Sequence, residues 1–207
     1  MGERLRIHPE TPQRRFVARA AEILSRHGVV ILPTDTTYAF AAQPGSKNAL
    51  EKIGRIKQFD SRKKLFSLIV PDLSDIARYA LVDNHNYRLL RRFLPGPYTF
   101  VLPATREVPR ILLTKRQTIG LRVPDNAVAR EVARAAGGGV LATTVRLPEE
   151  EYPLMDPEEI ETRLGNRVDL FLDGDWGGIE PSTVVDLTGE EGPGLIREGA
   201  GEPEPFR

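Results

Sequence analysis

Short apolar runs recur along this sequence, and segments with the periodicity of amphipathic helices separate them. Residues 29–32 (Val-Val-Ile-Leu) and 140–144 are largely apolar, which is typical of strands that are buried on both faces. Such strands need helices on each side of the sheet that they form. Further strands are predicted at residues 66–70, 98–102, 118–123, 168–172, 183–187 and 194–197.

Helix start and stop signals flank the intervening segments. A helix is predicted over residues 12–27, with Thr11 as its cap and Gly28 at its end. Ser46 and Asp156 precede two further segments of helical periodicity and suit the capping position, because their side-chain oxygens can accept a free backbone N–H. The remaining helices are predicted at residues 73–80, at residues 84–93, and from a cap at Asp125 to the glycines at 137–139.

The order of these elements indicates an α/β fold with a twisted sheet that helices flank. The C-terminal stretch is rich in strands and has no crossover helices between them, so the sheet is expected to be mixed in strand direction. A length of 207 residues, of which 40% are hydrophobic, suits a single domain over residues 1–207.

Composition excludes several kinds of site. The chain has no cysteine, so disulfides, thiol nucleophiles and cysteine-bound metals are ruled out. His8, His27 and His85 have no partners at ligand spacing, which supports neither a zinc site nor a histidine-based triad. A Walker loop and a spaced dinucleotide fingerprint are both missing. No apolar run approaches membrane-spanning length and no targeting segment is evident, so a cytoplasmic protein without membrane partners is expected.

Charge is distributed unevenly although the formal net charge is zero. Residues 1–146 contain 25 Lys and Arg against 12 Asp and Glu, whereas residues 147–207 contain 4 against 17. An excess of positive charge attracts anions, so ATP, pyrophosphate and RNA are candidate ligands of the first part. The alternative is a solvated basic face without a ligand.

Polar side chains stand at the ends of several predicted strands, where ligands bind in open α/β sheets. A single hydroxyl at such a position is more often a turn or capping residue, but the whole set favours a pocket for phosphate and an amino acid. The set comprises Thr34, Asp35, Thr36, Thr99, Arg122, Thr143 and Thr144, together with the basic residues Lys57, Arg62, Lys63 and Lys64.

Six segments, in order along the chain, resemble the YrdC/YciO family and together cover nearly all of it. Two of them, Thr-Ile-Gly-Leu-Arg-Val-Pro at 118–124 and Arg-Glu-Gly-Ala-Gly at 197–201, are closer to the YciO branch than to the YrdC branch. The other four are Pro-Thr-Asp-Thr-Thr-Tyr-Ala at 33–39, Lys57 with its basic loop, Leu-Pro-Gly-Pro-Tyr-Thr-Phe-Val-Leu at 94–102, and Pro-Ser-Thr-Val-Val-Asp at 181–186.

The resemblance implies a YrdC-like fold with a basic concave cleft. For the YrdC branch it also implies ATP-dependent synthesis of L-threonylcarbamoyladenylate from L-threonine and bicarbonate, a nucleotidyl transfer that supplies tRNA threonylcarbamoyladenosine. Members of the family have also been taken for double-stranded RNA binders. The extra C-terminal domain of the longer members is not expected here.

The resemblance further implies roles for individual residues. Thr34, Arg122 and Ser182 would bind threonine, with Arg122 pairing with its carboxylate through two parallel hydrogen bonds. The nucleotide would be held by Lys57, Arg62, Thr99, Thr144 and Arg197, and Lys63, Lys64 and Arg146 are further candidates near the phosphates.

The implied chemistry needs no catalytic nucleophile or protein-held metal. The threonine amine takes up carbon dioxide as a carbamate, and a carbamate oxygen then displaces pyrophosphate at the α-phosphorus. Positioning and charge neutralisation can accelerate both steps. Mg²⁺ is expected to enter with ATP, bound through phosphate oxygens.

Two segments differ from the synthase pattern. The synthases of the YrdC branch have Lys-x-Arg where this chain has Lys57-Gln58-Phe59, and they have Ser-x-Asn where it has Thr144-Val145-Arg146. Two hypotheses therefore stand: an adenylate-forming synthase, and an RNA- or nucleotide-binding module without efficient catalysis. A third hypothesis, that the chain is a relative that processes carbamoyl phosphate, has little support, because the zinc-finger and acylphosphatase segments that accompany such domains are not found in this sequence.

Overall fold

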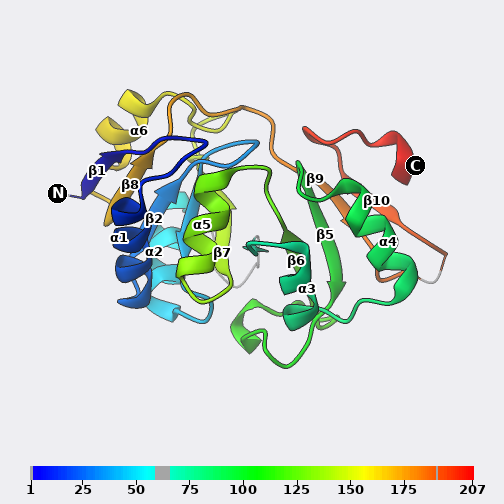
Figure 1. Ribbon diagram of the computed structural model, residues 1–207. Helices are drawn as coiled ribbons and strands as arrows, with labels where there is room; N and C mark the ends of the chain where they lie inside the picture. The colour runs from blue at the N-terminus through cyan, green and yellow to red at the C-terminus, as the bar shows by residue number, and fades with distance from the viewer. Residues whose placement is uncertain (1, 59–65, 190) are drawn as a thin grey trace.

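The computed structural model describes residues 2–58, 66–189 and 191–207, and ten strands within these ranges form one sheet (Figure 1). Their order across the sheet is β1-β8-β2-β3-β7-β4-β6-β5-β9-β10. The strands are β1 (Glu3–Arg6), β2 (Val29–Leu32), β3 (Ala39–Ala42), β4 (Ser67–Ile69), β5 (Tyr98–Pro103), β6 (Thr118–Arg122), β7 (Val140–Thr144), β8 (Leu170–Asp173), β9 (Thr183–Asp186) and β10 (Gly194–Arg197).

Strand directions in the sheet are mixed, as predicted. Strand β8 runs parallel to both of its neighbours, β1 and β2, and the pairs β4–β6 and β5–β9 are also parallel. The remaining neighbours, including the hairpin of β2 with β3, are antiparallel. The predicted α/β class and single sheet are therefore confirmed.

Helices cover both faces of the sheet, which explains the continuous apolar runs. In β2, Val29 and Ile31 point into one buried cluster while Val30 and Leu32 point into the other, because successive side chains of a strand face opposite ways. The helices are α1 (Arg14–Ser25), α2 (Lys47–Lys57), α3 (Leu73–Tyr79), α4 (Asn84–Phe93), α5 (Ala127–Ala135) and α6 (Pro157–Leu164).

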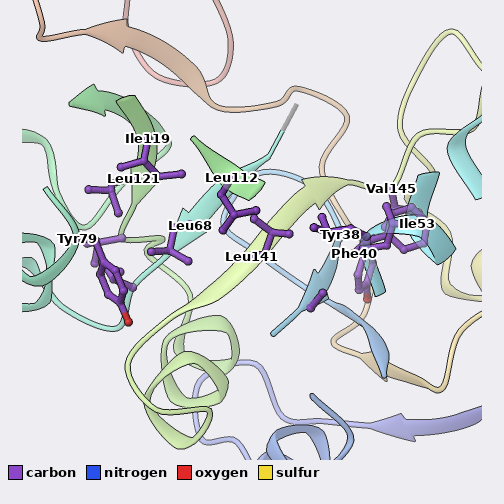
Figure 2. Close-up of a cluster of buried hydrophobic side chains, with 14 of the residues drawn as sticks. Tyr38, Phe40, Ile53, Leu68, Tyr79, Leu112, Ile119, Leu121, Leu141 and Val145 are labelled. Carbon is purple, nitrogen blue, oxygen red and sulfur yellow. The ribbon is translucent and has the colours of Figure 1, made fainter. Parts of the chain in front are cut away.

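Each face has its own set of helices. Helices α1 and α5 pack together on one face, where α1 contributes Ala20 and Leu24 and α5 contributes Val128 and Val132. The larger cluster on the other face takes side chains from α2, α3, α4 and α6. Figure 2 shows part of this larger cluster, in which Leu68, Leu121 and Leu141 lie on neighbouring strands β4, β6 and β7.

The helix caps agree with the prediction at two sites and differ at two. The side chain of Ser46 accepts from the backbone N–H of Ala49, and that of Asp156 accepts from Glu158. The cap of α5 is Asn126 rather than Asp125, and α1 begins at Arg14 after Gln13, which makes no side-chain capping bond. Thr11 instead donates to or accepts from the imidazole of His8, two residues before the cap.

Two strands were not predicted, and both depend on their neighbours. Strand β1 is a short polar edge strand paired only with β8, and β3 is an Ala-Phe-Ala-Ala segment between β2 and β7. Alanine has a low strand propensity, so pairing on both sides decides the conformation of β3. Within the described ranges, no helix is long and apolar enough to cross a membrane.

Candidate functional site

The loop that follows β2 meets the end of β6 at Arg122. The guanidinium Nη2 of Arg122 donates to the hydroxyl Oγ1 of Thr36 at 2.7 Å, lies 3.4 Å from Oγ1 of Thr34, and pairs with Oδ1 of Asp35. Thr34 also donates to the carbonyl of Thr37 at 2.6 Å, which closes the loop. Three consecutive loop residues therefore hold one end of the guanidinium.

Arg122 is buried but incompletely satisfied. Only 7% of the residue is exposed, and its Nε has no hydrogen-bond partner among the described residues. Burial lowers the pKa of Arg122, while the charge of Asp35 acts in the opposite direction. A buried donor without a partner is costly, and a ligand acceptor such as a carboxylate would remove that cost.

A second group of polar side chains comes from β5, from Ser182 just before β9, and from β10. The hydroxyls of Thr99 and Ser182 lie 2.7 Å apart and both residues are buried. Arg197 Nη2 donates to the carbonyl of Ser182 at 2.6 Å. Because β5 and β9 are parallel neighbours, Thr99 and Ser182 reach the same end of the sheet.

Lys57 is the last residue of α2, and its side chain reaches the end of β7. Its Nζ donates to the carbonyl of Thr144 on β7 and lies 6.0 Å from the centre of the Phe40 ring. Burial lowers the pKa of Lys57 to about 8, and the charge of Arg146 adds to that decrease. An anion bound next to this buried ammonium would stabilise its positive charge and raise its pKa again.

Lys57, Arg146 and Arg197 form a group of uncompensated cations. Partial desolvation of its guanidinium lowers the pKa of Arg197, although the residue as a whole is exposed, and the charges of Arg122 and Arg146 lower it further. Within the described part of the chain, none of the three forms an ion pair, whereas Arg122 is paired with Asp35. The group therefore presents positive charge to a ligand.

The structure brings together most residues that the sequence singled out. Direct contacts link Thr34 with Arg122, Thr99 with Ser182 and Lys57 with Thr144, and mutual charge effects link Arg122, Arg146 and Arg197. Arg62, Lys63 and Lys64 lie outside the described residues. In the described ranges no group of three or more His, Asp or Glu residues could hold a metal ion.

Sequence reasoning missed the segment that packs over the 34–38 loop. A Cβ at Gly178 would lie 1.9 Å from the carbonyl oxygen of Thr36, and one at Gly177 would lie 2.8 Å from the Tyr38 ring. The Tyr38 hydroxyl accepts from the backbone N–H of Gly174 at 3.0 Å. The Gly177-Gly178 pair was the available signal, since adjacent glycines often mark a close backbone approach.

The candidate site thus combines an α/β sheet with buried hydroxyls, one arginine paired with a carboxylate, and cations that have no carboxylate partner among the described residues. The family model of Sua5, YciO and YrdC, described as telomere recombination, matches residues 22–199. The chain belongs to this family, which confirms the resemblance found in the sequence.

Full-length relatives support the YciO branch. An uncharacterized protein of Haemophilus influenzae is 47% identical over 208 residues, with complete coverage of both chains. The crystal structure of Escherichia coli YciO is 44% identical, covers both chains completely and superposes with a TM-score of 0.93.

Synthases are more distant relatives. A threonylcarbamoyl-AMP synthase of Halorhodospira halophila is 30% identical over 170 residues, which is 82% of this chain and 88% of the synthase. A crystal structure of P. abyssi Sua5 complexed with L-threonine shares the fold, with a TM-score of 0.86 at 22% identity over 99% of this chain and 59% of that one.

Proposed function

We propose that this protein binds L-threonine, bicarbonate and ATP and forms L-threonylcarbamoyladenylate for the modification of tRNA. The observation that carries the proposal is Arg122, a buried arginine whose Nε has no hydrogen-bond partner in the described part of the chain. A carboxylate is the ligand that matches a guanidinium in shape and charge. The threonine bound to P. abyssi Sua5 and the activity of the Halorhodospira relative support an amino acid as the source of that carboxylate.

The site residues divide between the two substrates. Arg122, Thr34 and Ser182 would hold the threonine: the Nε of Arg122 has no partner among the described residues, and Thr34 Oγ1 lies 3.4 Å from its Nη2. Lys57, Thr99, Thr144 and Arg197 would hold the nucleotide, and Arg146 joins them through its charge. Magnesium would arrive as MgATP, held by phosphate oxygens, since the described residues contain no acidic ligand set for it.

Reaction at this site would rest on positioning and charge. The threonine amine reacts with carbon dioxide derived from bicarbonate and forms a carbamate. A carbamate oxygen then attacks the α-phosphorus, and the bond to the leaving pyrophosphate breaks. Lys57, Arg146 and Arg197 would stabilise the negative charge on the phosphates as this bond breaks.

The direct test is pyrophosphate release from ATP by the purified full-length chain, with the product identified by mass spectrometry. Release is expected to require both L-threonine and bicarbonate, and to fall when Arg122 is replaced by alanine. Pyrophosphate release that does not depend on threonine, or no release under any of these conditions, would contradict the synthase proposal.

A second candidate function is RNA or nucleotide binding without efficient catalysis. The specific observation in its favour is Arg146, an exposed cation where the synthases of the YrdC branch have an asparagine. Phosphate contacts release counterions, so binding of an RNA duplex should fall steeply with salt, by a slope of about −0.7 to −0.9 per contact in a double logarithmic plot. Salt-independent binding, measured by fluorescence anisotropy at several ionic strengths, would remove this candidate.

A further inference from the structure

Asp35 takes no part in the chemistry described above, yet it is the carboxylate that pairs with a cation of the site. Its Oδ1 pairs with Arg122 Nη2, and its Oδ2 accepts from the backbone N–H of Asp125 at 3.1 Å. The side chains are 9% exposed for Asp35 and 8% for Arg122. Asp35 thus joins the loop after β2, the end of β6 and the start of the α5 region through one buried carboxylate.

The contacts of Arg122 divide its guanidinium into two parts. Nη2 contacts Asp35 and the hydroxyls of Thr34 and Thr36, whereas Nε has no partner within the described residues. A carboxylate that holds Nη2 in this way fixes the plane of the guanidinium. The Nε–H then has a fixed direction. A ligand that binds to it does not lose free energy in ordering the Arg122 side chain.

The two parts of the site also differ in net charge. Arg122 and Asp35 compensate each other, while Lys57, Arg146 and Arg197 have no carboxylate partner among the described residues. A phosphate dianion at Arg122 would lie beside a buried negative charge and would be repelled. A zwitterionic amino acid carries one negative charge and a nearby ammonium, so its repulsion is much smaller.

We propose that Asp35 is a positioning and specificity-determining residue, which orients Arg122 toward a monocarboxylate and excludes phosphate groups from that position. The uncompensated cations then take the phosphates. The inference rests on the proposed function only for the identity of the monocarboxylate as that of L-threonine. The exclusion of phosphate at Arg122 depends on the Asp35 pair alone.

The test follows the Nε–H of Arg122 by NMR in the full-length chain, with the signal assigned through its loss in Arg122→Lys. L-threonine, acetate and inorganic phosphate are titrated separately. In the unmodified protein L-threonine and acetate are expected to shift the signal, and phosphate at the same concentrations is not. In Asp35→Asn, phosphate should also shift it and the threonine midpoint should rise about tenfold or more.

Two further variants distinguish the orientation of Arg122 from the negative charge at residue 35, and both of these from a general loss of protein stability. Asp35→Glu keeps the charge and displaces the carboxylate by one methylene group, so it should weaken threonine binding and still exclude phosphate. Asp173→Asn is the matched control, because Asp173 is a buried carboxylate that pairs with an arginine outside the site. It is expected to lower the melting temperature and to change neither titration.

Each result decides the inference. It is overturned if phosphate shifts the Arg122 signal in the unmodified protein, or if Asp35→Asn or Asp35→Glu leaves the relative response to threonine and phosphate unchanged. These titrations do not require catalytic turnover. Acetate tests whether a carboxylate binds at Arg122 even if the protein does not bind threonine. A chain that releases no pyrophosphate can therefore still pass or fail this test.

Discussion

Arg4 and Arg122 each lie beside an aspartate, but their surroundings differ. Arg4 on β1 donates to Asp173 at 2.8 and 3.1 Å, to Glu158 at 2.7 Å and also to Glu161. The hydrogen bond with Glu158 is the main reason that the pKa of Arg4 is raised. Arg122 contacts one carboxylate and two hydroxyls, its Nε has no partner among the described residues, and burial lowers its pKa.

Arg4 is satisfied by carboxylates, whereas Arg122 keeps a donor that no described residue accepts from. Three carboxylates satisfy Arg4, so it joins β1, β8 and α6 and leaves nothing for a ligand. A recess of about 450 Å³ nevertheless adjoins Arg4, and none of the proposed substrate-binding residues lines it. The recess therefore does not mark the proposed site, and the buried Nε–H of Arg122, which has no acceptor among the described residues, is the better indication of a binding position.

The largest expected effect comes from Arg122→Lys. An ammonium keeps the charge but cannot form two parallel bonds to a carboxylate, so the apparent affinity for L-threonine should fall about a hundredfold. ATP affinity should change by less than about threefold, since Lys57, Arg146 and Arg197 remain. Steady-state kinetics, with L-threonine and ATP varied in turn, distinguishes an effect on threonine affinity from an effect on ATP affinity. An unchanged threonine KM with weaker ATP binding would place Arg122 at the wrong substrate.

Arg146→Asn should have the next largest effect. Arg146 is exposed, and its charge lowers the pKa of both Lys57 and Arg197, which groups it with the cations proposed to bind phosphate. Its removal should raise the KM for ATP about tenfold, as the loss of one charge contact costs about 1.4 kcal/mol. A faster threonine-dependent pyrophosphate release would instead mean that the guanidinium obstructs the substrate.

A smaller effect is expected from pH. The pKa of Lys57 is lowered to about 8, so its amine loses its positive charge as the pH rises through that value. ATP affinity should therefore decrease from pH 7 to pH 9. In the ATP complex the pKa of Lys57 should be higher than in the free protein, because bound phosphate stabilises the ammonium. Calorimetric titration should show this decrease in the unmodified protein and not in Lys57→Met. Equal pH dependence in both would exclude Lys57 as the titrating group.

Arg4→Met should affect activity least. Glu158 and Glu161 are at least partly exposed, but Asp173 is buried and would lose its ion-pair partner, so the free energy of unfolding should fall by about 2–3 kcal/mol. Threonine and ATP affinities should stay the same, because Arg4 lies outside the group of site residues. Chemical denaturation together with the pyrophosphate assay measures both. A loss of threonine affinity comparable to that of Arg122→Lys would remove the distinction between the two arginines.

The sequence determined the elements whose signals are local. The apolar run at residues 29–32 formed a strand buried on both faces, and Ser46 and Asp156 capped the helices that they precede. The family motifs also led to Thr34, Lys57 and Arg122, and the structure adds the contacts of Arg122 with Thr34 and of Lys57 with Thr144. Periodicity and capping act over a few residues and can be read without knowing the fold.

Only the tertiary structure decided the features that join distant segments. Asp35 and Arg122 are 87 residues apart, and Tyr38 meets Asp175 across 137 residues. Strand β3 exists because β2 and β7 pair with it, and the approach of Gly178 to Thr36 exists because the connection from β8 to β9 crosses that loop (Figure 1). Such contacts depend on sheet order, which no local preference specifies. The Nε of Arg122, which has no partner in the ranges that the structure describes, depends in turn on these contacts, since burial and partners are properties of the packed chain.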